Sequence, residues 1–305
     1  MALSENPLRH LPDLDGLSGE ALCKLLDRAC ALSQGARPGS IHQSVVNLFY
    51  EPSTRTRVSF ELAAQRLGMT VVNIELERSS ATKGESLDDT LATLAAMGID
   101  HLVLRHPETG LPGRLLERMP AGLRLLNAGD GTGEHPSQAL LDAATLQAQG
   151  LNLAQARVAI VGDILHSRVA RSSAKLFSRL GVGELRLAGP AGWLPEDWPL
   201  PGASRHDSLR SAIEGADVVM MLRVQKERMS SDSWPDQAAY HRAWGLSAEA
   251  LSWAAPNCRV MHPGPINRGV EISSEVADGP QSLILEQVRM GVFARMALFE
   301  WLAEG

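Results

Sequence analysis

The sequence predicts an α/β protein with two domains, each built around a parallel sheet. The chain has 305 residues, which is more than one ordinary core holds and fits two domains of about 150 residues each. Short apolar runs alternate with amphipathic segments, a pattern typical of parallel strands that are joined by crossover helices. The chain is 44% hydrophobic and 21% charged, as expected for a soluble globular protein.

The expected strands are short apolar runs bounded by turn residues. In chain order they cover residues 44–50, 70–76, 101–105, 123–127, 157–163, 184–188, 217–222 and 258–262. Segments with helical periodicity fill most of the intervals between them. In open parallel sheets, ligands bind beyond the carboxyl ends of the strands, so the polar residues that follow these runs are the candidates for a functional site.

Two helices bear on the domain boundary and on the cysteines. Residues 18–35 form an amphipathic helix, with Cys23 and Cys30 expected on its inner face. A later helix opens at Ser137 and closes at Gly150, and a new α/β unit begins after it. We therefore expect a first domain over residues 1–149 and a second over 150–283, with the active site in the cleft between them.

The last segment, residues 284–305, is expected to pack back on the first domain as a long helix. Its apolar positions have helical spacing. They are Leu285, Val288, Val292, Met296 and Phe299. The length of this segment allows it to reach the first domain.

Composition excludes several classes of function. The net charge of −6 and the pI near 5.9 give no general attraction to nucleic acid or membranes. No run of 18 apolar residues occurs, and the start of the chain lacks the apolar segment of a signal peptide, which predicts a cytoplasmic protein. Three cysteines make no disulfide framework, and no His/Cys spacing suits a metal, so we expect neither metal nor cofactor.

The stretch "FYEPSTRTRVSFE", residues 49–61, predicts a helix that begins after Ser53 and ends at Gly68. Its expected buried positions are Phe60, Ala63, Ala64 and Leu67. Arg55 and Arg57 lie in the first turn, where the helix dipole disfavours each cation by about 0.3–1 kcal/mol.

A bound phosphate would reverse this penalty, because free backbone N–H groups, hydroxyls and a guanidinium converge at Ser53, Thr54, Arg55 and Thr56. The alternative is that Arg57 pairs with Glu61 and Arg55 points into solvent; we accept this for Arg57 only. The glycines of a Walker loop are absent.

Further polar residues follow other predicted strands, and each has a purely structural alternative. Arg105 ends one strand and could be an exposed loop residue. His135 and Gln138 lie on either side of Ser137 and could belong to an ordinary capped helix. The loop at 78–90 carries Ser79, Ser80 and Lys83, and could be a solvated connection or an arm that reaches an anion in this chain or a neighbouring one.

The second half repeats this arrangement. Arg168 follows a strand and a turn in "VAIVGDILHSRVARS", which lacks the glycines of a dinucleotide-binding motif. Arg223 and Gln225 leave the end of a buried strand, and Pro263-Gly264 form a turn whose carbonyl groups could accept from an amine. Such a site is rich in donors and has no evident nucleophile with a base partner. It suits transfer between two bound anionic substrates, catalysed by positioning and oxyanion stabilisation.

These motifs resemble those of the aspartate/ornithine carbamoyltransferase superfamily, most closely its aspartate branch. The resemblance covers nearly the whole chain. It rests on "FYEPSTRTRVSFE", "KGES", "RHP", "HPSQALLD", "VGDILHSRVARS", "RVQKER" and "HPGPINRG", in this order. Val169 and Gly264 depart from one well-known branch, and the allosteric behaviour of that branch is not carried over.

The resemblance implies a role for each matching residue. The positions that hold carbamoyl phosphate would be Ser53, Thr54, Arg55, Thr56, Ser79, Lys83, Arg105, His135, Gln138, Pro263 and Gly264. The catalytic positions among them would be Arg55, Thr56, Lys83, Arg105, His135 and Gln138. Aspartate would bind Lys83, Arg168, Arg223 and Gln225, with its amine near the turn at Pro263-Gly264. Glu51, through Arg168 and Arg228, would tie the two domains together in a closed state.

The implied reaction is transfer of the carbamoyl group to the amine of L-aspartate, which gives N-carbamoyl-L-aspartate and phosphate for de novo pyrimidine (UMP) biosynthesis. The resemblance also implies a homotrimer whose active sites are shared between subunits, with regulatory or dihydroorotase-like chains as possible partners. Two alternatives stay open at this point. One is an ornithine or other amino-acid carbamoyltransferase, and the other is a catalytically silent structural homologue.

Overall fold

The computed structural model describes residues 9–74, 85–195, 202–225 and 236–304. The chain divides into two compact units. Unit 1 comprises Met1–Ala144 and Arg289–Gly305, and unit 2 comprises Thr145–Val288. The helices α5 (Pro136–Ala148) and α11 (Ile284–Ala303) each begin in one unit and end in the other.

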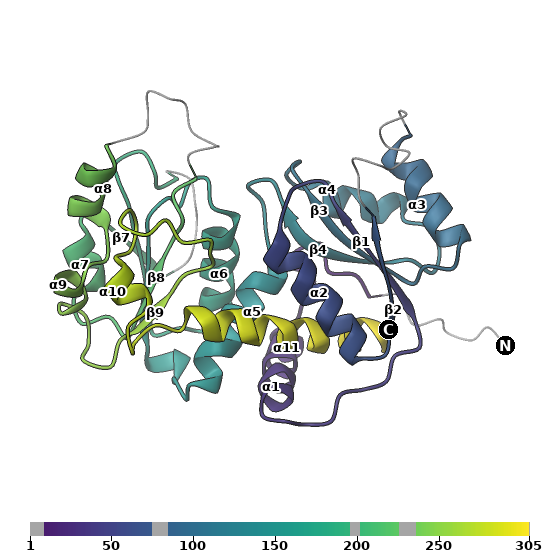
Figure 1. Cartoon of the computed structure of the whole chain (residues 1–305), viewed down its shortest axis with the longest axis horizontal. Coiled ribbons are helices and arrows are strands. Elements are labelled where there is room, and N and C mark those ends of the chain that lie inside the picture. The colour runs from purple at the N-terminus through teal and green to yellow at the C-terminus, as the bar shows by residue number, and fades with distance from the viewer. Residues whose placement is uncertain (1–8, 75–84, 196–201, 226–235, 305) are drawn as a thin grey trace. The chain divides into compact units, whose positions relative to one another are not determined.

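Unit 1 is built on a four-stranded parallel sheet with the order β2-β1-β3-β4 (Figure 1). Its strands are β1 (Ser44–Phe49), β2 (Thr70–Ile74), β3 (His101–His106) and β4 (Arg124–Asp130). In the register of the sheet, Phe49 lies opposite Arg105, and His106 lies opposite Asp130. The carboxyl ends of β1, β3 and β4 therefore meet at one edge of the sheet.

Helices cover both faces of this sheet. The helices of unit 1 are α1 (Gly19–Ser33), α2 (Thr54–Arg66), α3 (Leu87–Ala96), α4 (Leu111–Leu115) with the short 3-10 helix η3 (Leu116–Arg118), and the parts of α5 and α11 given above. The buried leucines of α3 and α4 pack against Val46, Leu48, Leu102 and Leu104 on one face. On the other face, the ring of Phe60 in α2 contacts Phe299 of α11, with the ring centroids 5.9 Å apart.

The side chain of Glu300 joins α11 to two other segments of unit 1. Its carboxylate accepts hydrogen bonds from Arg28 Nε (2.6 Å), Arg28 Nη2 (2.8 Å) and the backbone N–H of Gly39 (2.7 Å). Partial burial acts to raise the pKa of Glu300, but the bonds from Arg28 and Gly39 outweigh it and hold the pKa below its ordinary value of 4.5. The folded state is therefore stabilised by the ionised form.

We expect Glu300→Gln to lower the free energy of unfolding by about 1–2 kcal/mol at neutral pH, because the bonds lose their charge assistance. A lowered folded pKa contributes stability that is complete above the unfolded value and is lost as the pH falls through the folded one. The difference between the two proteins should thus shrink below about pH 4.5. Urea unfolding at several pH values measures it, with the exposed Glu304→Gln as control. A difference that stays constant down to pH 3 would contradict the assignment.

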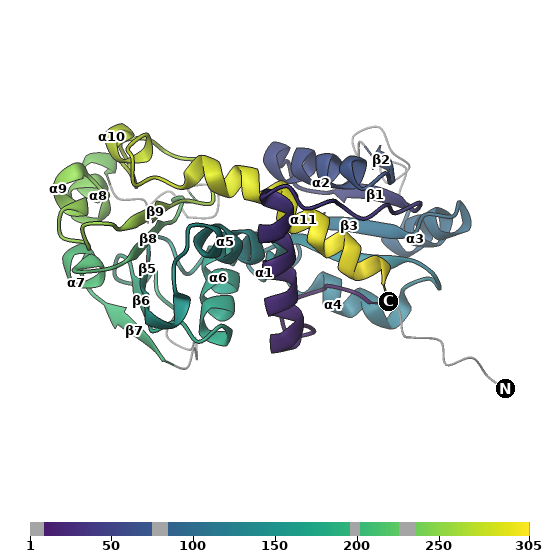
Figure 2. The ribbon, with the colours of Figure 1, turned by 90° about the horizontal axis from the view of Figure 1, so that it is seen from below.

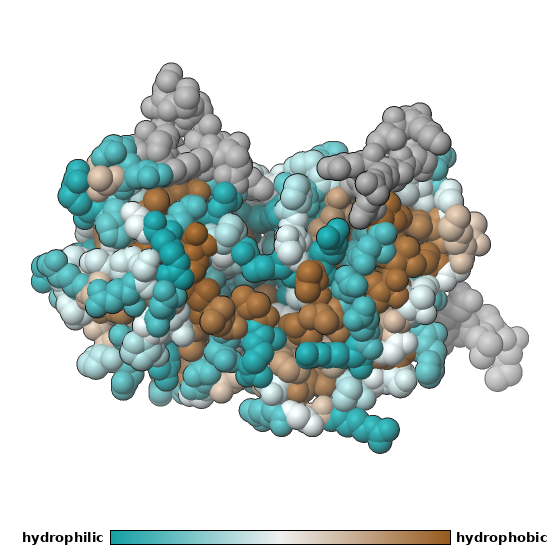
Figure 3. Space-filling view, viewed as in Figure 1, coloured by the Kyte–Doolittle hydropathy of each residue, from teal (hydrophilic) through white to brown (hydrophobic). Residues whose placement is uncertain are grey.

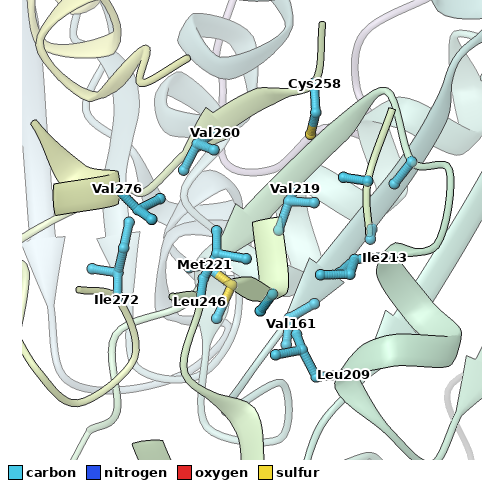
Figure 4. Close-up of a cluster of buried hydrophobic side chains, with 14 of the residues drawn as sticks. Val161, Leu209, Ile213, Val219, Met221, Leu246, Cys258, Val260, Ile272 and Val276 are labelled. Carbon is cyan, nitrogen blue, oxygen red and sulfur yellow. The ribbon is translucent and has the colours of Figure 1, made fainter. Parts of the chain in front are cut away.

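Unit 2 contains a five-stranded parallel sheet with the order β7-β6-β5-β8-β9. Its strands are β5 (Arg157–Val161), β6 (Glu184–Ala188), β7 (Ala203–His206), β8 (Val218–Met221) and β9 (Arg259–Met261). The other elements are η4 (Leu153–Gln155), α6 (Arg168–Arg179), α7 (Leu209–Ile213), α8 (Gln237–Trp244), α9 (Ala248–Leu251) and α10 (Ser274–Ala277). Side chains of β5, β8 and β9 such as Val161, Met221 and Val260 form a core with α7, α9 and α10 (Figure 4). In Figure 2, α6 lies on the other side of this sheet.

The predicted α/β class with two parallel sheets is confirmed, and several details of the sequence prediction are wrong. Strand β7 was not predicted, because three of its four residues are polar and it pairs with the sheet only at its edge. Cys30 is buried and its thiol lies 3.5 Å from the carbonyl of Ala144, but Cys23 is exposed. Cys30 belongs to the buried face of α1 and contacts α5 through Ala144, whereas Cys23 is not among the buried residues of this helix.

The prediction for the last helix holds for only part of its length. Met296 and Phe299 are buried in unit 1, whereas Leu285 and Val288 are 81% and 48% exposed. The reason is that the first turns of α11 belong to unit 2 and lie outside the core of unit 1.

The surface is mainly hydrophilic on the face drawn in Figure 3, with hydrophobic residues exposed over α2 among other places. Val58 and Leu62, both on α2, are 43% and 39% exposed. No helix in the described ranges has the length and apolar character needed to cross a bilayer.

Candidate functional site

The first group of predicted residues lies where β1 leads into α2. The helix begins at Thr54, with Ser53 as N-cap, and Arg55 is exposed in its first turn. No acidic residue lies in this turn, and the Ser53 side chain makes no capping bond to the described part of the chain. The predicted pair of Arg57 and Glu61 is wrong, because no ion pair joins them within the described residues and Glu61 accepts from Gln65 and Asn73 instead. The helix start therefore carries positive charge, which favours the binding of an anion.

Arg105 ends β3, beside the carboxyl end of β1. Its Nε lies 3.2 Å from Glu51 Oε2, and its Nη1 donates to the carbonyl of Ala128 at 3.2 Å. The exposed fractions of the Arg105 and Glu51 side chains are 13% and 20%. These partners hold the guanidinium in place at the sheet edge, which argues against the alternative of a solvated loop arginine.

His135 and Gln138 follow β4 at the start of α5. The helix begins at Pro136, so His135 rather than Ser137 occupies the N-cap position, and its carbonyl accepts from the N–H of Gln138 (2.9 Å). Proline is well suited to the first helical position, which explains the earlier start. Both His135 and Gln138 are buried, and Ser137 Oγ lies 3.4 Å from His135 Nδ1.

In unit 1 the three strand ends thus bring one set of donors to the same edge. Ser53–Thr56 follow β1, Arg105 ends β3, and His135 and Gln138 follow β4. Thr56 is also buried. A guanidinium, hydroxyls, an imidazole and a carboxamide can bind a phosphate and an adjoining carbonyl group.

Unit 2 presents a second set of donors after β5, β8 and β9, which are neighbours in the sheet. Arg168 is the first residue of α6 and is buried. The N-cap of α6 is Ser167, whose Oγ accepts from the N–H of Ala170 at 3.1 Å. Arg168 therefore repeats the arrangement of Arg55, because it places a guanidinium at the positive end of a helix that has no acidic residue in its first turn.

The loops after β5 and β8 are joined by hydrogen bonds. Gln225 Nε2 donates to the carbonyl of His166 at 3.1 Å. The fully buried Asp163 orders that loop, since its Oδ1 accepts from the N–H (3.2 Å) and lies 2.8 Å from Nδ1 of His166. Val224 packs in a small buried cluster with Trp193, Tyr240 and Val270, and thereby fixes the segment that carries Arg223 and Gln225.

The turn after β9 is held by a buried acid. His262 Nδ1 accepts from the N–H of Gly264 (2.8 Å), so its Nε2 carries the proton and donates to Glu271 Oε1 at 3.1 Å. The same oxygen accepts from the N–H of Asn267 at 2.6 Å. Gly264 has a φ of +66°, a conformation that favours glycine, which accounts for this residue between Pro263 and Pro265.

We expect Glu271→Ala to lower the free energy of unfolding by about 2–4 kcal/mol, because the buried ring N–H of His262 and the partly buried backbone N–H of Asn267 lose their acceptor. Glu275→Ala is the matched control: this acid is exposed on α10, and we expect a change within about 0.5 kcal/mol. Urea unfolding of the three proteins measures both effects. Equal stability of the two variants would rule out the anchoring role of Glu271.

Four of the residues considered in the sequence analysis lie outside the described residues. They are Ser79, Ser80 and Lys83 of the loop after β2, and Arg228 after Gln225. Their implied roles in substrate binding and domain closure stay predictions, as does the role of Glu51 in closure.

Sequence reasoning missed the supporting residues of the site. Asp163, His262 and Glu271 were not singled out, although Asp163 and His262 are each the last residue of a predicted strand. Asp142 was also missed, and its spacing of four from Gln138 on one helix was a usable signal. No group of three or more His, Cys, Asp or Glu residues suited to a metal ion occurs among the described residues.

Two parallel-sheet units, each with cationic and amide donors at the carboxyl edge of its sheet, define a transferase for anionic substrates. The chain belongs to the aspartate/ornithine carbamoyltransferase family. The carbamoyl-phosphate-binding domain of this family matches residues 9–148, and the aspartate/ornithine-binding domain matches residues 154–302. The resemblance inferred from the motifs is thereby confirmed.

Curated relatives match over nearly the whole chain. The aspartate carbamoyltransferase catalytic subunit of Legionella pneumophila (strain Lens) is 49% identical over 294 residues, which cover 96% of this chain and 98% of that one. The subunit of the same name from Xanthomonas campestris pv. campestris (strain B100) is 49% identical over 306 residues, with coverages of 98% and 97%.

Solved structures with the same fold come from both branches. Aspartate transcarbamoylase from Trypanosoma cruzi in complex with N-(phosphonacetyl)-L-aspartic acid has a TM-score of 0.86 and 30% identity, covering 97% of this chain and 96% of that one. Ornithine carbamoyltransferase from Pyrococcus furiosus has a TM-score of 0.85 at 22% identity, with 97% of both chains covered. The latter likeness concerns the fold alone.

Proposed function

We propose that this chain is an aspartate carbamoyltransferase, which transfers the carbamoyl group of carbamoyl phosphate to the amine of L-aspartate. The products are N-carbamoyl-L-aspartate and phosphate, and the reaction serves de novo pyrimidine biosynthesis. The observation that carries the proposal is the match of close to half of all residues, over nearly the full length, to catalytic subunits of this name. The donors at the carboxyl edges of both sheets supply groups suited to the two anionic substrates.

In this proposal the donors of unit 1 bind carbamoyl phosphate. The phosphate lies at the start of α2, on the backbone N–H groups and side chains of Ser53–Thr56, where the helix dipole and Arg55 supply positive charge. Arg105, His135 and Thr56 donate to the carbamoyl oxygen. Gln138 accepts from the carbamoyl amino group. Ser79 and Lys83 complete the phosphate site from a neighbouring subunit.

The donors of unit 2 bind aspartate. Arg168, Arg223 and Gln225 hold its two carboxylates, since guanidinium groups bind carboxylates in a bidentate geometry and the amide adds a further donor. The turn at Pro263-Gly264 faces the amine through its carbonyl groups. Glu51, with Arg168 and Arg228, stabilises the state in which the two units close on the substrates.

The reaction proceeds by attack of the uncharged aspartate amine on the carbamoyl carbon. The C=O bond becomes a C–O⁻ bond in a tetrahedral intermediate, whose oxyanion is stabilised by the donors from Arg105, His135 and Thr56. The C–O bond to phosphate then breaks, and the leaving phosphate takes the proton of the amine. No covalent enzyme intermediate is needed, because catalysis comes from positioning and charge stabilisation.

The ornithine alternative is disfavoured by the second half of the site. Ornithine would require an acid for its δ-ammonium group and, by comparison with the sister family, a cysteine in the turn before the last helix. The turn after β9 has Pro263, Gly264 and Pro265 instead, and Cys258 is buried in the core of unit 2. Arg223 and Gln225 offer donors that suit a second carboxylate.

Carbamoyl transfer by the purified protein tests the proposal. Carbamoyl phosphate is supplied with either L-aspartate or L-ornithine, and the carbamoylated product and phosphate are both measured. We expect turnover with aspartate only. Turnover with ornithine would overturn the substrate assignment, and a folded protein that is inactive with both would favour the silent homologue.

The proposal extends to assembly and location. We propose a homotrimer in which neighbouring subunits share active sites, and the exposed Val58 and Leu62 on α2 are consistent with a surface that another copy covers. Regulatory or dihydroorotase-like chains are its candidate partners. A cytoplasmic location fits two charged substrates, which do not cross membranes unaided.

A further inference from the structure

A buried acid lies directly behind one of the proposed substrate-binding residues. Gln138 Nε2 donates to Asp142 Oδ1 at 3.0 Å, across one turn of α5. The Asp142 side chain is fully buried, and Gln138 is 8% exposed. An ionised carboxylate only accepts hydrogen bonds, so the amide nitrogen of Gln138 must face it. The carbonyl oxygen of the amide then points to the other side.

A buried arginine of opposite charge interacts electrostatically with Asp142. Arg295 on α11 is 3% exposed, its guanidinium stacks on the ring of Phe60 at 4.7 Å, and its Nη1 donates to the carbonyl of Gly291 at 2.9 Å. Burial lowers the pKa of Arg295 to about 9, and the negative charge of Asp142 acts in the opposite direction. Arg295 therefore stays charged at neutral pH. Asp142 and Arg295 are both buried, and their opposite charges interact favourably.

We propose that Asp142 is a positioning residue that fixes the orientation of the Gln138 carboxamide and thereby selects an amino group, rather than a methyl group, on the substrate. The inference rests on the proposed function. With Nε2 held by Asp142, Gln138 presents Oε1 as an acceptor for the carbamoyl –NH2. With the amide turned over, Gln138 would present N–H groups to the carbamoyl N–H groups, and the two would repel.

If Asp142 orients the Gln138 amide, its loss should affect carbamoyl phosphate and acetyl phosphate differently. A purely structural role of Asp142 would not distinguish the two compounds. Acetyl phosphate carries the same phosphate and carbonyl as carbamoyl phosphate, but a methyl group replaces the amino group. Its binding does not use an acceptor on Gln138. Loss of the orientation should therefore weaken the use of carbamoyl phosphate and leave the inhibition constant of acetyl phosphate nearly unchanged, whereas a general disturbance of unit 1 should weaken both.

The first experiment compares the parent protein with Asp142→Asn, an isosteric change that lets the amide turn over. For carbamoyl phosphate we expect kcat/KM to fall about 10- to 100-fold, as when one preorganised hydrogen-bonding group is lost. The inhibition constant of acetyl phosphate should change less than about threefold. In a protein that already carries Gln138→Ala, Asp142→Asn should cause no further loss of kcat/KM, as for residues that act as one unit. Parallel losses for both compounds, or additive losses in the double variant, would overturn the proposal.

A second pair of variants tests the same geometry by rescue. Gln138→Glu places a carboxylate against Asp142 and should be strongly impaired. Adding Asp142→Asn supplies an amide donor to the new carboxylate, whose other oxygen again faces the substrate. We expect the double variant to regain at least about tenfold in kcat/KM over Gln138→Glu alone. Absence of rescue in a folded double variant would refute the positioning role.

The activity of the parent protein distinguishes a failure of this inference from a failure of the proposed function on which it rests. If the parent does not carbamoylate aspartate, the proposed function fails irrespective of the variants. If the parent is active and the variants behave as described for general disturbance, only the role of Asp142 fails.

Discussion

Arg55→Ala is expected to lower kcat/KM for carbamoyl phosphate by about 30- to 5,000-fold, because removing one partner of a hydrogen-bonded charge pair costs about 2–5 kcal/mol. The physical reason lies in the start of α2. The helix places the positive end of its dipole at Ser53–Thr56, with no acidic residue in the first turn, so a bound dianion there interacts favourably with both the dipole and the guanidinium.

Arg57→Ala is the matched control for this prediction. Arg57 lies in the same turn, is exposed, and forms no ion pair with Glu61 in the described residues. We expect its kcat/KM to stay within about threefold of the parent, since surface substitutions have small effects. Steady-state assays over a range of carbamoyl phosphate concentrations measure both variants. Equal losses would show that net positive charge on the helix, rather than Arg55 itself, attracts the substrate.

Arg105→Ala is expected to reduce kcat by about 10²- to 10³-fold, the usual cost of removing one oxyanion donor. Because the donor acts chiefly on the charge that develops in the transition state, kcat and kcat/KM should fall by similar factors. Glu51 and the carbonyl of Ala128 position the guanidinium at the end of β3 before substrate arrives. This preorganisation is what makes the donor effective.

Arg114→Ala controls for the loss of an arginine from the same unit. Arg114 is 53% exposed and pairs with Glu108 at the surface. We expect its kcat to change less than about twofold, because surface ion pairs contribute little. A loss in Arg105→Ala that appears only in the KM for carbamoyl phosphate would mean that Arg105 binds the ground state and does not stabilise the oxyanion.

The sequence was sufficient to predict elements with a strong local signal. Alternation of apolar and amphipathic segments predicted the parallel sheets, and the strand ends marked the polar residues near the site. In α2, the N-cap at Ser53, the buried Phe60 and the terminal Gly68 were all predicted, because capping and periodicity depend on residues within a few positions of one another. Strand β7 was not predicted, because its strand conformation depends on pairing with the sheet and not on a pattern in its own four residues.

The sequence by itself determined the class of protein and suggested the residues that are proposed to touch substrate. Only the tertiary structure decided which residues hold them in place. Asp142 and Arg295 are 153 positions apart and meet because α11 returns to unit 1, and Glu271 becomes the anchor of the turn after β9 only once that turn folds over it. Such pairings form only when buried segments that are far apart in the chain come close together. Burial then turns an ordinary acid into a fixed hydrogen-bond acceptor.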